Sequence, residues 1–334
     1  MHKRIYTRMR LITFDDIIDI YTEIHLRDLG FIFAKINFSA RKRTKATFNQ
    51  RAKISADYWI IPAIRRRWNH KISGDPDTSY EDYFVRKFLQ QKDNLKFLAL
   101  GSGIASHEMA FARHGCFREV KCIDFSENKL KEARDIAIRE SLHNMVFEPA
   151  DINRYEFPRN TYDVVLFHSS LHHFKNVDSL LDKVHGTLRP GGFLLINEYV
   201  GPNRLQISRE KIKIINGILA EIIPPQYRKR VKTGLIKNRV HGPGYLRMLF
   251  SDPSEAIESE NILPAVRKKF QVVEEKNPGG DLTMLLFKDI AHHFTDDTEE
   301  KAGILNQVFS IEDQFLENKD QDSDFIFGVY RKNP

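Results

Sequence analysis

Cysteine and long apolar runs are both scarce in this chain of 334 residues. The only two cysteines, Cys116 and Cys122, match no metal-ligand spacing and no disulfide framework, which favours a cytoplasmic setting. No run reaches the roughly 20 apolar residues that span a bilayer, since Lys35 interrupts the nearest candidate at residues 30–38. The N-terminus lacks a continuous apolar segment, so we expect no secretory signal. No zinc or paired-carboxylate pattern is present either, so we expect no metal.

The positive charge is concentrated near the N-terminus. The chain carries a net charge of +7, yet residues 1–75 hold 16 Lys or Arg against 7 Asp or Glu, which leaves the remainder slightly negative. A basic extension of this kind favours a peripheral contact with an anionic membrane surface, or with nucleic acid. A solvated helical face is the alternative. The pattern of an RNA-binding module is missing, and we expect no nucleic-acid partner.

The most informative stretch of the sequence runs from Leu95 to Gly115. Residues 97–100 are apolar and predict a strand buried on both faces. The turn Gly101-Ser102-Gly103 follows, and Ser106 is placed to cap a helix that Gly115 ends. Such a strand, glycine turn and helix let a ligand approach bare backbone N–H groups.

The segments downstream repeat an alternation of strands and helices. Residues 120–123 predict a second strand ending in Asp124, 23 residues after Gly101, where a carboxylate can accept hydrogen bonds from both hydroxyls of a ribose. Further strands are expected at 145–147, 162–167 and 193–196, with a helix over 178–188 that residues 189–192, Arg-Pro-Gly-Gly, terminate.

These motifs together resemble class I S-adenosylmethionine-dependent methyltransferases. The likeness is carried by LALGSG, Asp124, PAD at 149–151, YDVVLFHSSLHH and LRPGGFLLINE, in the family's order and spacing. It implies a Rossmann-like α/β sheet with helical cap insertions and an N-terminal helical extension. It also implies S-adenosyl-L-methionine as cofactor, bound by Gly101, Ser102, Gly103, Asp124, Phe125, Asp151, Ile152 and His168.

Two positions depart from the family's pattern. The family often has an acidic residue two before the first glycine, where Ala99 stands, and a third glycine where Ala105 stands. The contact to the amino group of the cofactor's methionine part is therefore unassigned.

The rest of the chain predicts a core with additions. We expect a basic extension at 1–55 and a methyltransferase domain at 56–334, divided into a helical lead-in (56–94), a cofactor-binding core (95–200), a cap insertion (201–268) and C-terminal strands and helices (269–334). Within these, periodicity predicts helices over 205–223 and 281–294. Tyr80, Tyr83, Phe84 and Phe88 fall near helical spacing, either as a wall of the cofactor pocket or as packing against the sheet.

Candidate catalytic groups follow the fourth and fifth strands, because ligands sit at the carboxyl ends of strands in such a sheet. We favour His173 as general base for a hydroxyl, with His172 as a second candidate and Glu198 orienting the base or the acceptor. The alternative is that the histidines only shape the loop. Tyr199, Asn203 and Arg204 are the candidate substrate-binding residues.

The acceptor is suggested by resemblance alone. Residues 58–331 resemble a group of bacterial methyltransferases that often sit beside polysaccharide genes, which implies O-methylation of a sugar, glycan or other small molecule.

Three other classes stay open, and the oligomeric state is undetermined. A nicotinamide-dependent dehydrogenase would share the glycine turn and Asp124, but Ala105 breaks its GxGxxG register. A nucleic-acid methyltransferase would explain the basic extension, although residues 168–171, His-Ser-Ser-Leu, are not the Pro-Pro-aromatic corner of enzymes that methylate base nitrogens. A non-catalytic scaffold is the third class.

Overall fold

The computed structural model describes residues 9–26, 57–317 and 322–333. The chain forms two compact units: the first comprises residues 1–68, 201–255 and 279–324, and the second 69–200, 256–278 and 325–334. Most of the predicted basic extension, residues 1–55, lies outside the described residues, and the predicted domain boundaries stay a prediction. Among the described residues, no helix combines the length and apolarity needed to cross a membrane.

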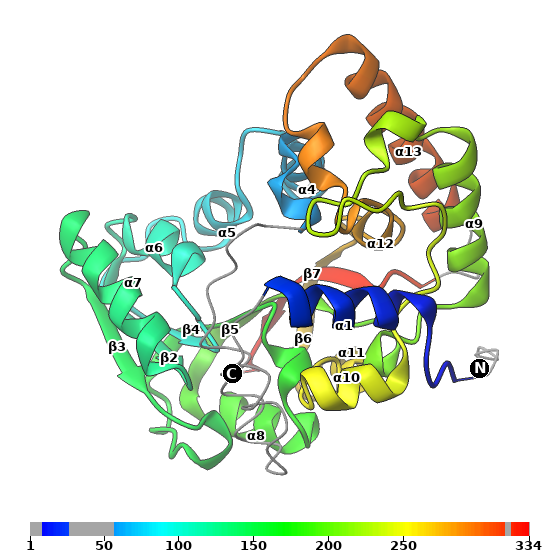
Figure 1. Ribbon diagram of the computed structural model, residues 1–334. Helices are drawn as coiled ribbons and strands as arrows, with labels where there is room; N and C mark the ends of the chain where they lie inside the picture. The colour runs from blue at the N-terminus through cyan, green and yellow to red at the C-terminus, as the bar shows by residue number, and fades with distance from the viewer. Residues whose placement is uncertain (1–8, 27–56, 318–321, 334) are drawn as a thin grey trace. The chain divides into compact units, whose positions relative to one another are not determined.

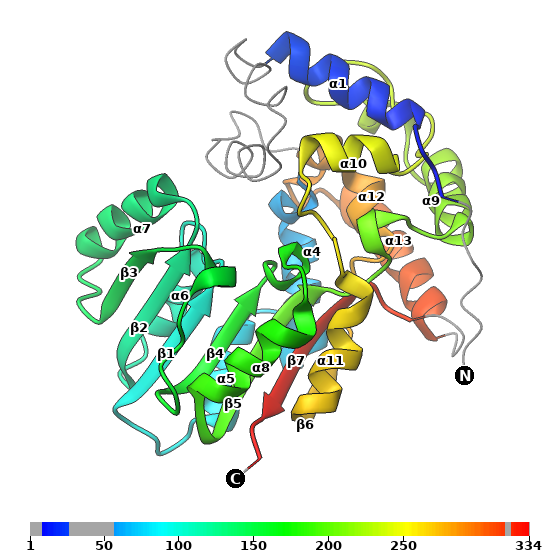
Figure 2. The ribbon, with the colours of Figure 1, turned by 90° about the horizontal axis from the view of Figure 1, so that it is seen from below.

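The second unit is built around one seven-stranded sheet with the order β3-β2-β1-β4-β5-β7-β6, drawn in Figures 1 and 2. Its first five strands are parallel, and β7 is antiparallel to both of its neighbours. This order and the single reversed strand confirm the predicted Rossmann-like class I methyltransferase fold. The strands are β1 (Leu95–Leu100), β2 (Phe117–Asp124), β3 (Met145–Pro149), β4 (Tyr162–His168), β5 (Leu188–Tyr199), β6 (Gln271–Lys276) and β7 (Phe325–Arg331).

Helices cover both faces of this sheet because its central strands are apolar throughout. On one face Phe97 of β1 packs against Phe111, and Phe84 also contacts Phe111, which places α5 (Tyr80–Phe88) and α6 (Ser106–Ala112) there. On the other face Leu98 joins the core formed with α8 (Val177–Thr187) and α11 (Ile262–Lys269). The helix α7 (Glu127–Arg139) packs on β2 and β3.

The first unit is mainly helical and has a core of its own. Apolar residues from its helices and from the loops between them are buried together, among them Ile215, Leu286 and Val308. Its helices are α1 (Phe14–Leu26), α9 (Arg209–Glu221), α10 (Tyr245–Ser251), α12 (Thr283–Phe287) and α13 (Glu299–Glu317), with α4 (Pro62–Ser73) reaching across the boundary between the units. Short 3-10 turns lie at Tyr58–Ile60, Asn203–Leu205, Pro225–Tyr227 and Ala291–Phe294.

The prediction of one helix over 281–294 is wrong. The chain forms α12 and then a 3-10 turn, because Asp289 between them adopts a φ of 69°. Its carboxylate accepts a hydrogen bond from Arg230 at 2.7 Å, and its carbonyl accepts one from the amide of Val231. These tertiary bonds hold the left-handed conformation that interrupts the helix.

Three other boundaries differ from the prediction. The helix expected over 205–223 begins at Arg209, capped by Ser208, because Arg204 and Leu205 have positive φ angles. Residues 189–192 do not end a helix in a turn but are part of β5. The helix after the glycine turn begins at Ser106, with Ala105 at its N-cap in left-handed conformation, and it ends at Ala112, before Gly115.

A buried carboxylate ties three segments of the first unit together. Glu312 of α13 is completely buried, and its Oε1 accepts hydrogen bonds from the amides of Leu282 and Thr283 at the start of α12. Its Oε2 accepts a hydrogen bond from Arg67 of α4 at 2.7 Å. One side chain thus satisfies the first amides of a helix and a cation at once.

Replacing this carboxylate should destabilise the first unit. We expect Glu312→Ala to lower the free energy of unfolding by about 3 kcal/mol, because two amides and a largely buried guanidinium lose their carboxylate partner. Urea unfolding of the purified protein measures this change. Glu317→Ala, at an exposed position of the same helix, is the matched control and should change stability by less than about 0.5 kcal/mol. Equal stability of the two variants would show that Glu312 is not a structural anchor.

Candidate functional site

The glycine turn lies where the carboxyl end of β1 meets the residues that follow β4. Gly101 has a φ of +78°, and a Cβ added there would lie 2.7 Å from the Cβ of Ser170. The Ser170 hydroxyl donates to the carbonyl of Leu100 at 2.7 Å, which holds the two strand ends together. Gly103 also has a positive φ, and the amide of Ser102 between them points at the carbonyl of Ile123. Only glycine fits this close approach.

Asp124 is placed as predicted, at the end of β2 beside the turn. Its Oδ2 accepts a hydrogen bond from the amide of Gly103 at 2.9 Å, and its Oδ1 accepts one from the amide of Ser126 at 2.7 Å. A carboxylate has about four acceptor positions, so two remain for ribose hydroxyls. Asp124 therefore fits both tasks, fixing the loop and receiving a nucleoside.

The residues predicted around an adenine follow β2 and β3. Asp151 caps the 3-10 turn Ile152–Arg154 and accepts a hydrogen bond from the amide of Asn153 at 3.2 Å. Ile152 is buried in the core, while Phe125, directly after Asp124, is half-buried. The spacing of these groups along one sheet edge fits the predicted nucleoside site, and their roles stay predictions.

His168 ends β4 inside an aromatic stack. Its ring lies parallel to Tyr80, and a hydrogen bond of 2.9 Å joins its Nδ1 and the Tyr80 hydroxyl. The centroid of the His168 ring is 3.6 Å from that of His107. Burial, together with the positive charge of His107, lowers the pKa of His168 well below its usual range. His168 is therefore neutral at pH 7, and its ring packs against those of Tyr80 and His107.

Two carboxylates near this stack escaped prediction from the sequence. Glu81 of α5 pairs with His107, Oε1 to Nδ1, at 2.6 Å. Glu108, in the first turn of α6, is 3% exposed. Burial first, and then the charges of Glu81 and Asp124, raise the pKa of Glu108 to about 7. In the sequence both look like ordinary helix-surface acids, because their burial depends on how α5 and α6 pack.

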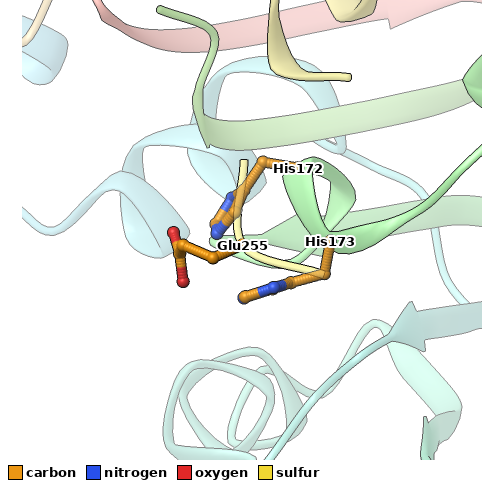
Figure 3. Close-up of side chains that lie close together, drawn as sticks. All are labelled: His172, His173 and Glu255. Carbon is orange, nitrogen blue, oxygen red and sulfur yellow. The ribbon is translucent and has the colours of Figure 1, made fainter. Parts of the chain in front are cut away.

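The candidate catalytic groups after β4 and β5 form one hydrogen-bonded pair. Glu198 is 1% exposed, and its Oε2 accepts a hydrogen bond from Nδ1 of His172 at 2.7 Å. Its Oε1 accepts hydrogen bonds from the amides of Ser170 and Leu171. Among the described residues Glu198 has no hydrogen bond to His173, the base favoured from the sequence. Figure 3 shows His172 and His173 leaving the same short helix, Leu171–His173, with ring centroids 4.2 Å apart.

The three predicted substrate-binding residues are placed in different ways. Tyr199 is buried at the end of β5, where its ring packs on Phe325. Asn203 and Arg204 belong to the first unit. Arg204 is largely buried, and its Nη1 donates to the carbonyls of Pro253 and Glu255, so this nitrogen has a structural task within its own unit.

The closeness of Gly101 to Ser170 gives a stability prediction. We expect Gly101→Ala to lower the free energy of unfolding by about 1 to 3 kcal/mol, because alanine is strained at this φ and its methyl group collides with Ser170. Gly115→Ala is the control, since a Cβ there meets no atom within 4 Å. Thermal unfolding of both variants measures the difference. If Gly101→Ala is as stable as Gly115→Ala, the turn does not require glycine.

Comparison with known proteins identifies a methyltransferase domain in this region. Residues 98–196 match a family model described as a methyltransferase domain. Over 70 residues the chain is 38% identical to the tenellin synthetase of Beauveria bassiana (strain ARSEF 2860), covering 20% of this chain and 2% of that protein. It is 27% identical over 149 residues to the 27-O-demethylrifamycin SV methyltransferase of Amycolatopsis mediterranei (strain S699), covering 43% of this chain and 54% of that one.

A solved structure superposes on this chain in part. The phosphoethanolamine N-methyltransferase 2 of Haemonchus contortus in complex with S-adenosyl-L-methionine superposes with a TM-score of 0.48 at 17% identity, over 80% of this chain and 57% of that one. The chain thus spans less than two thirds of each of these relatives.

The matched domain decides between the cofactors that the glycine turn allowed. It runs from within β1 to within β5 and includes both glycines, Asp124, His168 and His172. A methyltransferase domain takes its methyl group from a sulfonium donor, whereas a dehydrogenase would need a nicotinamide. The predictions of a methyltransferase and of S-adenosylmethionine as its cofactor are therefore confirmed for the domain at residues 98–196.

Proposed function

We propose that the protein methylates a hydroxyl group, with His172 as the general base and Glu198 as the residue that positions it. The observation that supports this most is the buried hydrogen bond between Nδ1 of His172 and Oε2 of Glu198, 2.7 Å long, at the carboxyl ends of β4 and β5. Ligands of doubly wound sheets bind at these ends.

The pair suits proton removal for electrostatic reasons. A carboxylate that accepts from Nδ1 keeps the proton on that nitrogen, so Nε2 carries the lone pair of the neutral ring. When Nε2 takes a proton, the negative charge of Glu198 stabilises the resulting imidazolium. Glu198 cannot turn away, because the amides of Ser170, Leu171 and Tyr199 also bind its oxygens.

The reaction balances with these groups alone. When bound, S-adenosylmethionine supplies a methyl group from its sulfonium sulfur. The leaving group is the neutral thioether that remains. The acceptor oxygen forms the new carbon–oxygen bond while its proton passes to Nε2 of His172, giving a methyl ether, the demethylated cofactor and a protonated base. A positioned base of this kind contributes about 10² to 10⁴ in rate.

For the acceptor we propose a sugar, a glycan or another small molecule. The support is the resemblance of residues 58–331 to methyltransferases associated with polysaccharide genes. Related proteins are named for different acceptors, among them a phosphoethanolamine N-methyltransferase and a sterol 24-C-methyltransferase. The proposed base favours a hydroxyl over an amine as the acceptor. A neutral amine can attack the methyl group before it loses its proton, so an amine would not need the base.

Substitution of the pair tests the proposal. We expect His172→Asn to lower kcat by about 10² to 10⁴ while S-adenosylhomocysteine affinity, measured by calorimetry, stays within about threefold. His173→Asn, next to it in the chain, is the matched control and should keep most of the activity. Turnover is followed as transfer of a labelled methyl group into glycan, nucleic-acid and small-molecule fractions of a cell extract. The proposal is wrong if His172→Asn retains turnover, or if the label enters only nucleic acid.

A contact with an anionic membrane surface is a separate proposal about the first unit. The helix α1 exposes Phe14, Ile17 and Ile20 on one side, at 58%, 55% and 49%, and Phe250 of α10 is 64% exposed. Figures 1 and 2 show α1 and α10 side by side, and the amides of Tyr245 and Leu246 bind carbonyls just before α1. Residues 27–56, which follow α1, contain 8 Lys or Arg and one Asp. Exposed apolar side chains on a helix that a basic segment follows in the sequence suit an anionic bilayer interface.

Vesicle flotation tests this contact on the full-length protein. We expect binding to phosphatidylserine-containing vesicles at low salt, weakened by added salt because charges are screened. The double variant Ile17→Glu, Ile20→Glu should bind less, whereas Ile138→Glu, at an exposed apolar position of α7, should bind normally. Failure of the unmodified protein to bind anionic vesicles would contradict the proposal.

A further inference from the structure

Glu108 is a buried acid in the helix that follows the glycine turn. It is 3% exposed, and α6, which carries it, begins three residues after Gly103. Within the part of the chain that the structure describes, the only hydrogen-bond donor to its carboxylate is its own amide. Buried carboxylates are normally paired, because an unpaired one loses its hydration without compensation.

The charges around Glu108 do not neutralise it. His107 is the adjacent cation, but its Nδ1 already binds Glu81 at 2.6 Å. Asp124 adds a further negative charge, and the carboxylates of Glu81 and Asp124 both raise the pKa of Glu108. The charge of His107 lowers the pKa of Glu108, but burial and the charges of Glu81 and Asp124 outweigh it and raise this pKa to about 7, so a bound cation would stabilise the ionised carboxylate.

We propose that Glu108 binds the ammonium group of the methionine part of S-adenosylmethionine, an inference that rests on the proposed function. The methionine part of this cofactor ends in an ammonium and a carboxylate, and a cation is what the buried Glu108 lacks. The position two residues before the first glycine, Ala99, is completely buried and brings no charge. Glu108 supplies that charge from the neighbouring helix.

The competing explanation is structural. Glu108 stands in the first turn of α6, where a carboxylate is stabilised by the free amides of the helix. That role predicts loss of stability on substitution and an equal effect on every ligand. The ammonium role predicts a selective effect on ligands that carry the amino acid.

Calorimetry with three ligands separates these roles on the full-length protein. S-adenosylmethionine carries both the ammonium and the sulfonium, S-adenosylhomocysteine carries only the ammonium, and 5′-methylthioadenosine carries neither. We expect Glu108→Gln to weaken the first two by about 10- to 100-fold, the range for a hydrogen bond to a charged group, and 5′-methylthioadenosine by less than about twofold. Asp124→Asn is the comparison and should weaken all three, because each contains the ribose.

Thermal unfolding without ligand shows whether the variant is folded. At pH 8 we expect Glu108→Gln to unfold at a temperature no lower than that of the unmodified protein, because the substitution removes a buried unpaired charge. A clear loss of stability would support the structural role instead.

The other outcomes are equally distinct. Equal weakening of all three ligands by Glu108→Gln, or no weakening of any, overturns the assignment. Weakening of S-adenosylmethionine alone overturns it too, since it would assign Glu108 to the sulfonium. If the unmodified protein binds none of the three ligands, the proposed function fails and this inference with it.

Discussion

The site depends on the contact between the strand ends of β1 and β4, where Gly101 lies against Ser170. In a sheet with this strand order the chain leaves in opposite directions from β1 and β4, which opens the crevice that ligands of such folds occupy. Ser170 joins the two halves, because its hydroxyl binds the carbonyl of Leu100 while its amide binds Glu198. A chain of hydrogen bonds therefore links the glycine turn to the proposed base across three strands.

Two buried carboxylates in this region differ in what surrounds them. Glu198 accepts hydrogen bonds from three backbone amides and one imidazole, so protein groups replace the water that its carboxylate loses on burial. Among the described residues, Glu108 accepts a hydrogen bond only from its own amide, and burial raises its pKa to about 7. A satisfied carboxylate can hold another group in place, whereas an uncompensated one favours binding a cation. This contrast is why Glu198 is assigned to positioning and Glu108 to ligand binding.

Local sequence was enough to predict the sheet and the nucleoside edge. The short apolar runs at 97–100 and 162–167 are typical of strands buried on both faces, and Asp124 follows from its spacing to the glycines. The break at Asp289 was not predictable, because it depends on Arg230, which is 59 residues away. For the same reason the sequence could not tell which of two adjacent histidines meets Glu198, or that α5 and α6 bury Glu108.

Calorimetric titration of the unmodified protein with S-adenosylhomocysteine and, separately, with a nicotinamide dinucleotide tests the central claim most directly. The match of residues 98–196 to a methyltransferase domain, with Ala105 in place of the third glycine of a dinucleotide motif, predicts saturable binding of S-adenosylhomocysteine and none of the dinucleotide. Tight binding of the dinucleotide without binding of S-adenosylhomocysteine would contradict the assignment of this site to methyl transfer.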